Sequence, residues 1–344
     1  MFVDREHELA SLHRHLAEAL AGNGQICFVA GQAGSGKTAL VHHFVEQAFA
    51  SNAEVALAAG SCNAQTGAGD PYLPFREALA MLTGQVTAKG AKAGGPAEND
   101  RRLRTVLVRS VQILVEVAPD LVGVLVPGGK LIGEFGKAIA EKVGWMDRLE
   151  LLAEKKGLAA GAGETPAEQS RILEQYTSFV QRLSQKIPLI LFLDDLQWAD
   201  GASINLLFHL GRRLESSRVL IIGSYRPNDL AAGREGQRHP LEPVLNELTR
   251  YYGDITLDLD AIPEEGQRRF VDSLLDSEPN ALGEEFRAAL FRHTGGHERF
   301  DSLLDLVGQR QAGKRLINRR SYQTWADICH VSPASCTHVT LQTT

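Results

Sequence analysis

The sequence Gly-Gln-Ala-Gly-Ser-Gly-Lys-Thr, at residues 31–38, constrains the fold more than any other part of the chain. Residues 25–30 before it are apolar, and residues 39–49 after it carry apolar side chains at helical spacing. A strand, a glycine-rich loop and a helix in this order predict a phosphate-binding loop at the N-terminus of the helix. We expect Lys37 to reach the β- and γ-phosphate oxygens and Thr38 to ligate Mg²⁺. The residues that this motif assigns to nucleotide binding are Gly31, Gln32, Ala33, Gly34, Ser35, Gly36, Lys37, Thr38 and Ala39.

Short apolar segments alternate with segments of helical periodicity along most of the chain. The expected strands are residues 25–30, 54–59, 188–194, 219–224 and 255–259. Alternating strands and helices predict an α/β fold of three layers, in which helices cover both faces of a parallel five-stranded sheet. Ligands of such sheets bind beyond the carboxyl ends of the strands, where Gly31, Asp194 and Arg226 fall. We therefore expect these three residues to converge on one site.

A second motif is the apolar run of residues 188–193, which ends in two aspartates. A carboxylate at the end of a buried strand needs a cation or a hydrogen-bond partner, so we expect Asp194 to ligate Mg²⁺ as a Walker B aspartate. Asp195 stands where many hydrolytic relatives carry a glutamate that orients the attacking water. Since aspartate is one methylene shorter and the geometry of a general base is demanding, we expect slow hydrolysis. The alternative role for Asp195 is to interact with the groups that bind the metal, without binding the metal itself.

Arg226 follows the predicted strand 219–224. From a neighbouring strand end its guanidinium would contact the γ-phosphate or a carboxylate of the metal site. The alternative is an arginine that caps a surface loop before Pro227. The candidate catalytic residues are therefore Lys37, Asp195 and Arg226.

Composition excludes several classes of protein. The chain carries 36 basic and 42 acidic residues, a net charge of −6, which argues against a dominant nucleic-acid or membrane surface. Residues 103–126 are apolar, but charged side chains and Pro119 interrupt them, so we expect a buried helical hairpin there. The N-terminus has no apolar signal region, and the four cysteines form no disulfide framework. We expect a cytoplasmic protein.

Four segments together resemble the motifs of STAND ATPases, the AAA+-related signal transduction ATPases with numerous domains. They are Phe-Val-Asp-Arg-Glu at 2–6, Leu-Asp-Asp-Leu-Gln-Trp-Ala-Asp at 193–200, Ser-Tyr-Arg-Pro at 224–227 and His-Thr-Gly-Gly-His at 293–297. The resemblance covers about residues 1–310, and the preference for ATP over GTP rests on it.

The resemblance implies a nucleotide switch. In this family bound ADP keeps a closed form inactive, and exchange for ATP permits oligomerisation, as in the maltose-regulon type of activator. By position, Arg5 and Glu6 would lie near the adenine, and His297 would approach the phosphates from the lid. These three residues join the expected nucleotide-binding set.

The sequence also predicts a division into domains. We expect an ATPase core over residues 1–262 with a helical insertion at about 84–164, a helical lid over 263–312 and an irregular tail over 313–344. The tail shows neither tandem helical repeats nor a recognition helix, which favours a truncated or frame-disrupted gene product.

The leading hypothesis for function is a slowly hydrolysing ATP/ADP switch module of a signalling or transcription-regulatory ATPase. One alternative is an actively hydrolysing ATPase of the origin-recognition or loader type that acts on DNA. Another is a switch-defective, truncated ATP-binding protein. Expected partners are the nucleotide with Mg²⁺ and further copies of the chain in an ATP-dependent homo-oligomer, without membrane or direct nucleic-acid binding.

Overall fold

The structure is a computed structural model, and it describes residues 5–63, 71–84, 97–118, 121, 165–233, 238–261, 284, 287 and 288. The chain divides into two compact units. The larger unit comprises residues 8–31 and 37–257, and the smaller unit comprises residues 1–7, 32–36 and 258–344. The predicted tail and His297 lie outside the described residues, and so does the predicted lid except for residues 284, 287 and 288.

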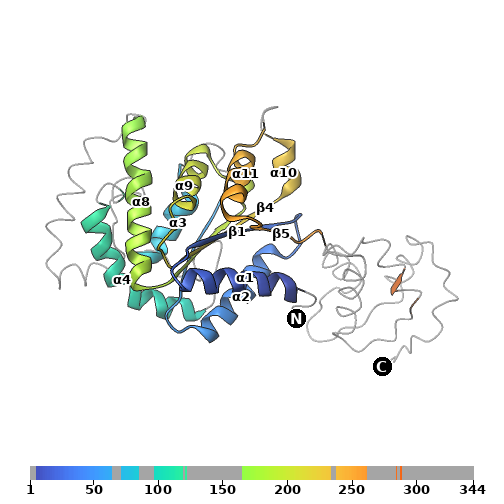
Figure 1. The fold of residues 1–344 in the computed structure, drawn as a ribbon, viewed down its shortest axis with the longest axis horizontal. Coiled ribbons are helices and arrows are strands. Elements are labelled where there is room, and N and C mark those ends of the chain that lie inside the picture. The colour runs from blue at the N-terminus through green and yellow to red at the C-terminus, as the bar shows by residue number, and fades with distance from the viewer. Residues whose placement is uncertain are drawn as a thin grey trace, which may run out of the picture. The chain divides into compact units, whose positions relative to one another are not determined.

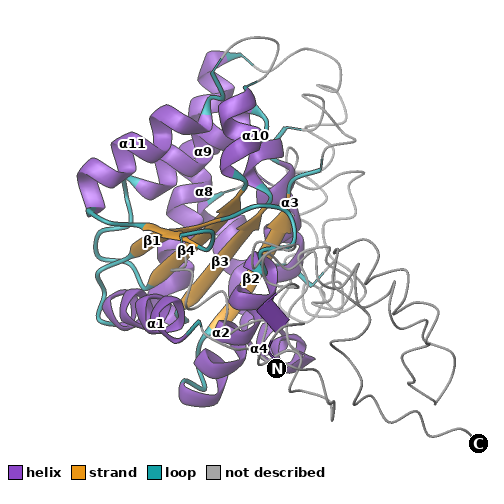
Figure 2. Ribbon diagram, turned by 90° about the vertical axis from the view of Figure 1, so that its right-hand side faces the viewer, coloured by secondary structure: helices purple, strands orange, loops and turns teal. Residues whose placement is uncertain are grey.

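A five-stranded parallel sheet forms the centre of the larger unit (Figure 2). Its strands, in the order β2-β3-β4-β1-β5, are β2 (Ala56–Ser61), β3 (Leu189–Asp194), β4 (Val219–Tyr225), β1 (Gln25–Ala30) and β5 (Thr256–Asp258). The prediction of a parallel five-stranded sheet is therefore confirmed. Every residue of β3 and β4 is buried, as expected for continuous apolar runs in the middle of a parallel sheet, whereas β5 is a short, partly exposed edge strand.

Helices cover both faces of this sheet and complete the predicted three layers (Figures 1 and 2). On one face lie α1 (Glu6–Leu20) and α2 (Lys37–Ser51), and on the other lie α9 (Gly201–Gly211) and α11 (Leu241–Tyr252). The remaining helices with described bounds are α3 (Leu73–Leu82), α4 (Ala97–Val117), α8 (Pro166–Lys186), α10 (Pro227–Ala232) and the 3₁₀ turn η3 (Leu196–Trp198). Within the part of the chain that the structure describes, no helix has the length and apolar character needed to cross a membrane.

The start of α8 shows how local sequence sets a helix boundary. The Thr165 side chain accepts a hydrogen bond from the Glu168 backbone N–H, and the Glu168 carboxylate accepts one from the Thr165 N–H, with Pro166 at the first helical position. This reciprocal pair satisfies two backbone donors that the first turn leaves without partners. The predicted start of this helix after Thr165 is confirmed.

The helix α3 was not predicted; it follows a segment rich in glycine and polar residues. Its first turn passes against β2 so closely that a Cβ on Gly60 would lie 1.8 Å from the Pro74 carbonyl oxygen. Gly60 is therefore required by the close approach of two backbones rather than by a turn.

The described part of the predicted insertion, α4, packs on the core against β2 and α8. The Arg102 guanidinium donates to the carbonyl oxygens of Phe49, Asn52 and Val55 at 2.7, 2.6 and 3.1 Å. It also lies 4.3 Å from the centre of the Phe49 ring. Arg102 thus caps the carboxyl end of α2, the helix that begins at Lys37. Residues 122–164 of the predicted insertion lie outside the described residues.

Candidate nucleotide-binding site

The glycine-rich loop leaves β1 at Gly31 and enters α2 at Lys37. Gly34 and Gly36 have φ values of 84° and 80°, in the left-handed region that favours glycine. The Ser35 backbone N–H donates to the Gln32 carbonyl at 3.2 Å and tightens the turn. These backbone conformations explain why the loop carries glycine at two positions.

Within the smaller unit, the tip of the loop is held by residues distant in sequence. The Arg5 guanidinium donates to the carbonyl oxygens of Leu259 at 3.1 Å and Ser35 at 3.5 Å. The Gln32 N–H donates to Asp260 Oδ2 at 2.9 Å. Arg5, expected near the adenine, therefore lies against the loop backbone, while Glu6 opens α1 and is exposed.

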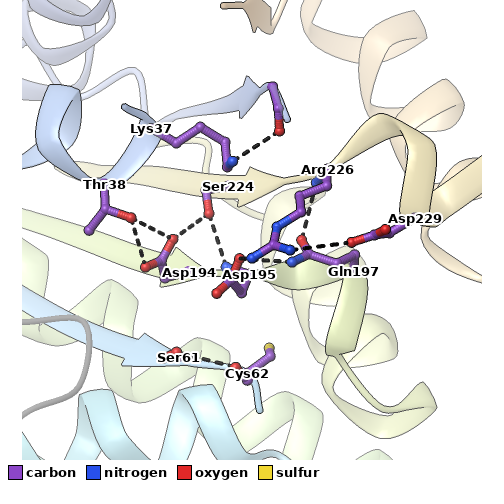
Figure 3. Close-up of polar contacts among 11 residues, drawn as sticks. Lys37, Thr38, Ser61, Cys62, Asp194, Asp195, Gln197, Ser224, Arg226 and Asp229 are labelled. Carbon is purple, nitrogen blue, oxygen red and sulfur yellow. Dashed lines mark hydrogen bonds and ion pairs between the residues drawn. The ribbon is translucent and has the colours of Figure 1, made fainter. Parts of the chain in front are cut away.

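Lys37 is the first residue of α2 and is 7% exposed. Its ammonium group donates to the Gly31 carbonyl at 2.9 Å, across the base of the loop (Figure 3). A buried ammonium is stable only where acceptors or anions surround it. The side chain is consequently positioned where an incoming phosphate oxygen would be a stronger partner than a neutral carbonyl.

Thr38 and Asp194, the two expected Mg²⁺ ligands, are in direct contact. The Thr38 hydroxyl donates to Asp194 Oδ2 at 3.1 Å and lies 3.4 Å from Oδ1 (Figure 3). A hydroxyl and a carboxylate supply the hard oxygen ligands that Mg²⁺ prefers, and Mg²⁺ in nucleotide sites usually takes only one or two protein carboxylates. The described residues contain no group of three or more His, Cys, Asp or Glu side chains able to hold a metal by themselves. The donor set therefore fits a metal shared with phosphates.

The charge state of Asp194 reflects its burial at the end of β3. Loss of solvent raises the pKa of its carboxyl, and the neighbouring Asp195 adds to this effect. Hydrogen bonds from Ser224 and Thr38 and the charge of Lys37 oppose the shift without cancelling it. A cation at this carboxylate would favour the charged form that burial disfavours.

Asp195 adopts an unusual backbone conformation, with φ 58° and ψ 45° in the left-handed region. Its N–H donates to Ser224 Oγ at 2.9 Å, and the same hydroxyl donates to Asp194 Oδ1. Ser224 is fully buried in β4, so one side chain of β4 holds both the Asp194 carboxylate and the Asp195 backbone. Its position within the Ser-Tyr-Arg-Pro motif was visible in the sequence, but its partners were not.

Arg226 stands at the N-cap of α10, directly after β4. Its guanidinium forms two ion pairs of 3.8 Å, Nη2 with Asp195 Oδ1 and Nη1 with Asp229 Oδ2 (Figure 3). Among the described residues, its Nε is buried without a hydrogen-bond partner. Arg226 thus joins the acidic end of β3 and also contacts its own helix, as a loop-capping arginine would.

The parallel register explains why these side chains meet. Ala30 pairs with Tyr225 and Leu193 with Gly223, so the carboxyl ends of β1, β3 and β4 are level. Lys37, Asp194 and Arg226 follow or end these strands. A cation donor, an oxygen pair for a metal and a second carboxylate are therefore gathered at one edge of the sheet.

Comparison with known proteins gives one finding on the family. A family model described as an AAA ATPase domain matches residues 1–222, which include the glycine-rich loop and both aspartates. No curated protein matches the chain. The match ends before Arg226.

Proposed function

Because the chain belongs to the AAA ATPase domain family, which makes it a nucleotide-binding ATPase domain, we propose that it is a slow ATP/ADP switch. The observation that carries this proposal is the contact of Thr38 with Asp194 beside the buried Lys37. These three groups supply what a Mg²⁺–triphosphate requires: a cation for the phosphates, and a hydroxyl and a carboxylate for the metal.

In this proposal Lys37 exchanges the Gly31 carbonyl for β- and γ-phosphate oxygens. Thr38 and Asp194 hold Mg²⁺, which when bound would neutralise charge on the phosphates during transfer. The nucleotide-binding set further includes residues 31–36 and Ala39 at the loop, with Arg5 and Glu6 toward the base and His297 from the lid. The last three rest on the resemblance to STAND ATPases.

Asp195 is proposed to orient the attacking water. Its side chain is 31% exposed and lies beside Asp194, so a water molecule can reach it. Its short side chain supports slow hydrolysis, because a misplaced acceptor forfeits much of the gain from general-base catalysis.

Arg226 is proposed to contact the γ-phosphate. Its two ion pairs are long and each partner is about one third exposed, so little free energy holds the guanidinium in place. Its Nε is buried and has no hydrogen-bond partner among the residues that the structure describes, which supports the binding of a further oxygen acceptor by this guanidinium. An arginine that leaves Asp195 for a γ-phosphate would make the end of β4 respond to the difference between ATP and ADP.

A regulatory role is favoured over a DNA-loading role by the net charge of −6 and by aspartate at position 195. The test measures the nucleotide released from the purified protein, then single-turnover ATP hydrolysis and molar mass with ATP or ADP. A switch predicts nearly stoichiometric ADP, turnover below about 1 s⁻¹ and a larger mass with ATP. Rapid turnover stimulated by DNA would favour the loader, and an affinity for nucleotide too weak to measure would refute both.

A further inference from the structure

Gln197 lies in η3, the short turn between the two aspartates and α9, and the proposed function gives it no role. The side chain is 2% exposed, although a glutamine usually lies at the surface. Its Nε2 donates to Asp195 Oδ1 at 2.7 Å, much closer than the 3.8 Å of the Arg226 ion pair to the same oxygen (Figure 3). A buried amide at the proposed water-orienting residue calls for an explanation.

The orientation of this amide follows from its second partner. The Arg226 backbone N–H donates to Gln197 Oε1 at 3.1 Å. A backbone N–H can only donate, so the amide oxygen must face Arg226 and the amide nitrogen must face Asp195. Gln197 therefore joins the Asp195 carboxylate to the first residue after β4.

The backbone of the turn is fixed as well. The Leu241 N–H donates to His239 Nδ1 at 3.2 Å, so Nδ1 is an acceptor and the ring proton sits on Nε2. That Nε2 lies 3.0 Å from the Gln197 carbonyl oxygen and donates to it. His239 is 1% exposed, so the residues preceding α11 hold η3 from a buried position.

We propose that Gln197 is the positioning residue for ATP hydrolysis, because its amide holds Asp195 Oδ1 and so directs Oδ2 toward the attacking water. This inference rests on the proposed role of Asp195. The Arg226 ion pair contacts the same Oδ1, but only at 3.8 Å, and an arginine that moves to a γ-phosphate no longer restrains the carboxylate. The neutral donor Gln197 keeps its hold on Oδ1 in that state, since it is bonded to the Arg226 backbone and not to the guanidinium.

The test is a double-mutant cycle of Gln197→Leu and Asp195→Asn, measured by single-turnover hydrolysis with enzyme in excess, ATP affinity and thermal unfolding. Leucine has similar volume but neither donor nor acceptor. We expect Gln197→Leu to slow cleavage about tenfold and to change ATP affinity by less than about threefold, since a positioning bond acts on the reaction and not on binding. In the Asp195→Asn background the same substitution should slow cleavage no further, because it acts through Asp195.

A second variant guards against misfolding. Gln197→Glu keeps the acceptor for the Arg226 N–H but replaces the donor with a charge that repels Asp195, so it should also slow cleavage. Gln181→Leu is the matched control, because Gln181 donates to the Arg213 carbonyl at the exposed surface of α8. Equal slowing in both backgrounds, or normal cleavage in both Gln197 variants while Asp195→Asn is slow, would overturn the inference. Normal cleavage by Asp195→Asn would instead refute the proposed role of Asp195, and this inference with it.

Discussion

The Thr38 hydroxyl donates a hydrogen bond to Asp194 Oδ2 at 3.1 Å and so joins the first turn of α2 to the end of β3. The two residues are 156 positions apart, and each would be a metal ligand in a nucleotide-bound state. In the proposed site these two oxygen-bearing side chains would hold Mg²⁺. We therefore expect tight nucleotide binding to require Mg²⁺. The Thr38–Asp194 contact already holds the two proposed ligands together in the absence of the metal.

We expect Thr38→Ala to weaken ATP binding in the presence of Mg²⁺ about tenfold or more. Binding in EDTA should change by less than about threefold, because the lost hydroxyl contributes a metal ligand. Fluorescent-nucleotide titrations with and without Mg²⁺ measure both values. Ser51→Ala is the control, since Ser51 carries a hydroxyl at the far end of the same helix. Equal losses in both conditions would assign Thr38 to the phosphates or to folding.

Lys37→Ala is expected to abolish tight nucleotide binding, because in the proposed site the ammonium would supply charge-assisted bonds to the phosphates. Its stability without nucleotide should also fall, since the ammonium donates to the Gly31 carbonyl and its charge favours the ionised form of the buried Asp194. Calorimetric titration and thermal unfolding separate the two effects. Wild-type affinity in this variant would refute the assignment of the loop.

The stability of the nucleotide-free protein should depend on pH through Asp194. Burial raises the pKa of this carboxyl in the folded state above its ordinary value of 3.8. A raised folded pKa contributes stability that is fully present below the ordinary value and is lost as pH rises through the folded value. Asparagine does not ionise, so Asp194→Asn should not lose free energy of unfolding in this way. Relative to the wild type, the variant should gain stability as pH rises from 3.8 through the folded-state pKa of Asp194. Urea unfolding across pH 4 to 8 tests the sign, and a constant difference would contradict it.

The sequence predicts the sheet well and the site only in part. Apolar runs such as residues 188–193 identify buried strands, because a parallel sheet excludes water from both faces. The acidic pair and Lys37 are recognisable from their positions after strands. Ser224 and Gln197 are not, because their partners are fixed only when β3, β4 and η3 are packed together. The helix α3 was missed because its position depends on the absent Cβ of Gly60, a tertiary feature.

Arg102→Leu should destabilise the larger unit by about 2–3 kcal/mol, because hydrogen bonds from a charged donor to the partly buried carbonyl oxygens at the end of α2 are lost. Urea unfolding measures this loss, with the exposed Arg109→Leu as the control on the same helix. If both substitutions lower the free energy of unfolding equally, the loss comes from a weaker helix α4 and not from the contacts of Arg102 with α2.

Discrimination between ATP and ADP is expected to depend on Arg226. Arg226→Ala should slow ATP hydrolysis about 100-fold or more and reduce the preference for ATP over ADP, because a donor aimed at transferring phosphate acts mainly in the transition state. Arg226→Lys should not restore the rate, since an ammonium lacks the planar fork of donors that a guanidinium presents to two phosphate oxygens. Arg250→Ala is the matched control, because Arg250 is 77% exposed and pairs with Glu247 on the same helix. If Arg226→Ala hydrolyses ATP at the wild-type rate, the guanidinium serves only its ion pairs with Asp195 and Asp229.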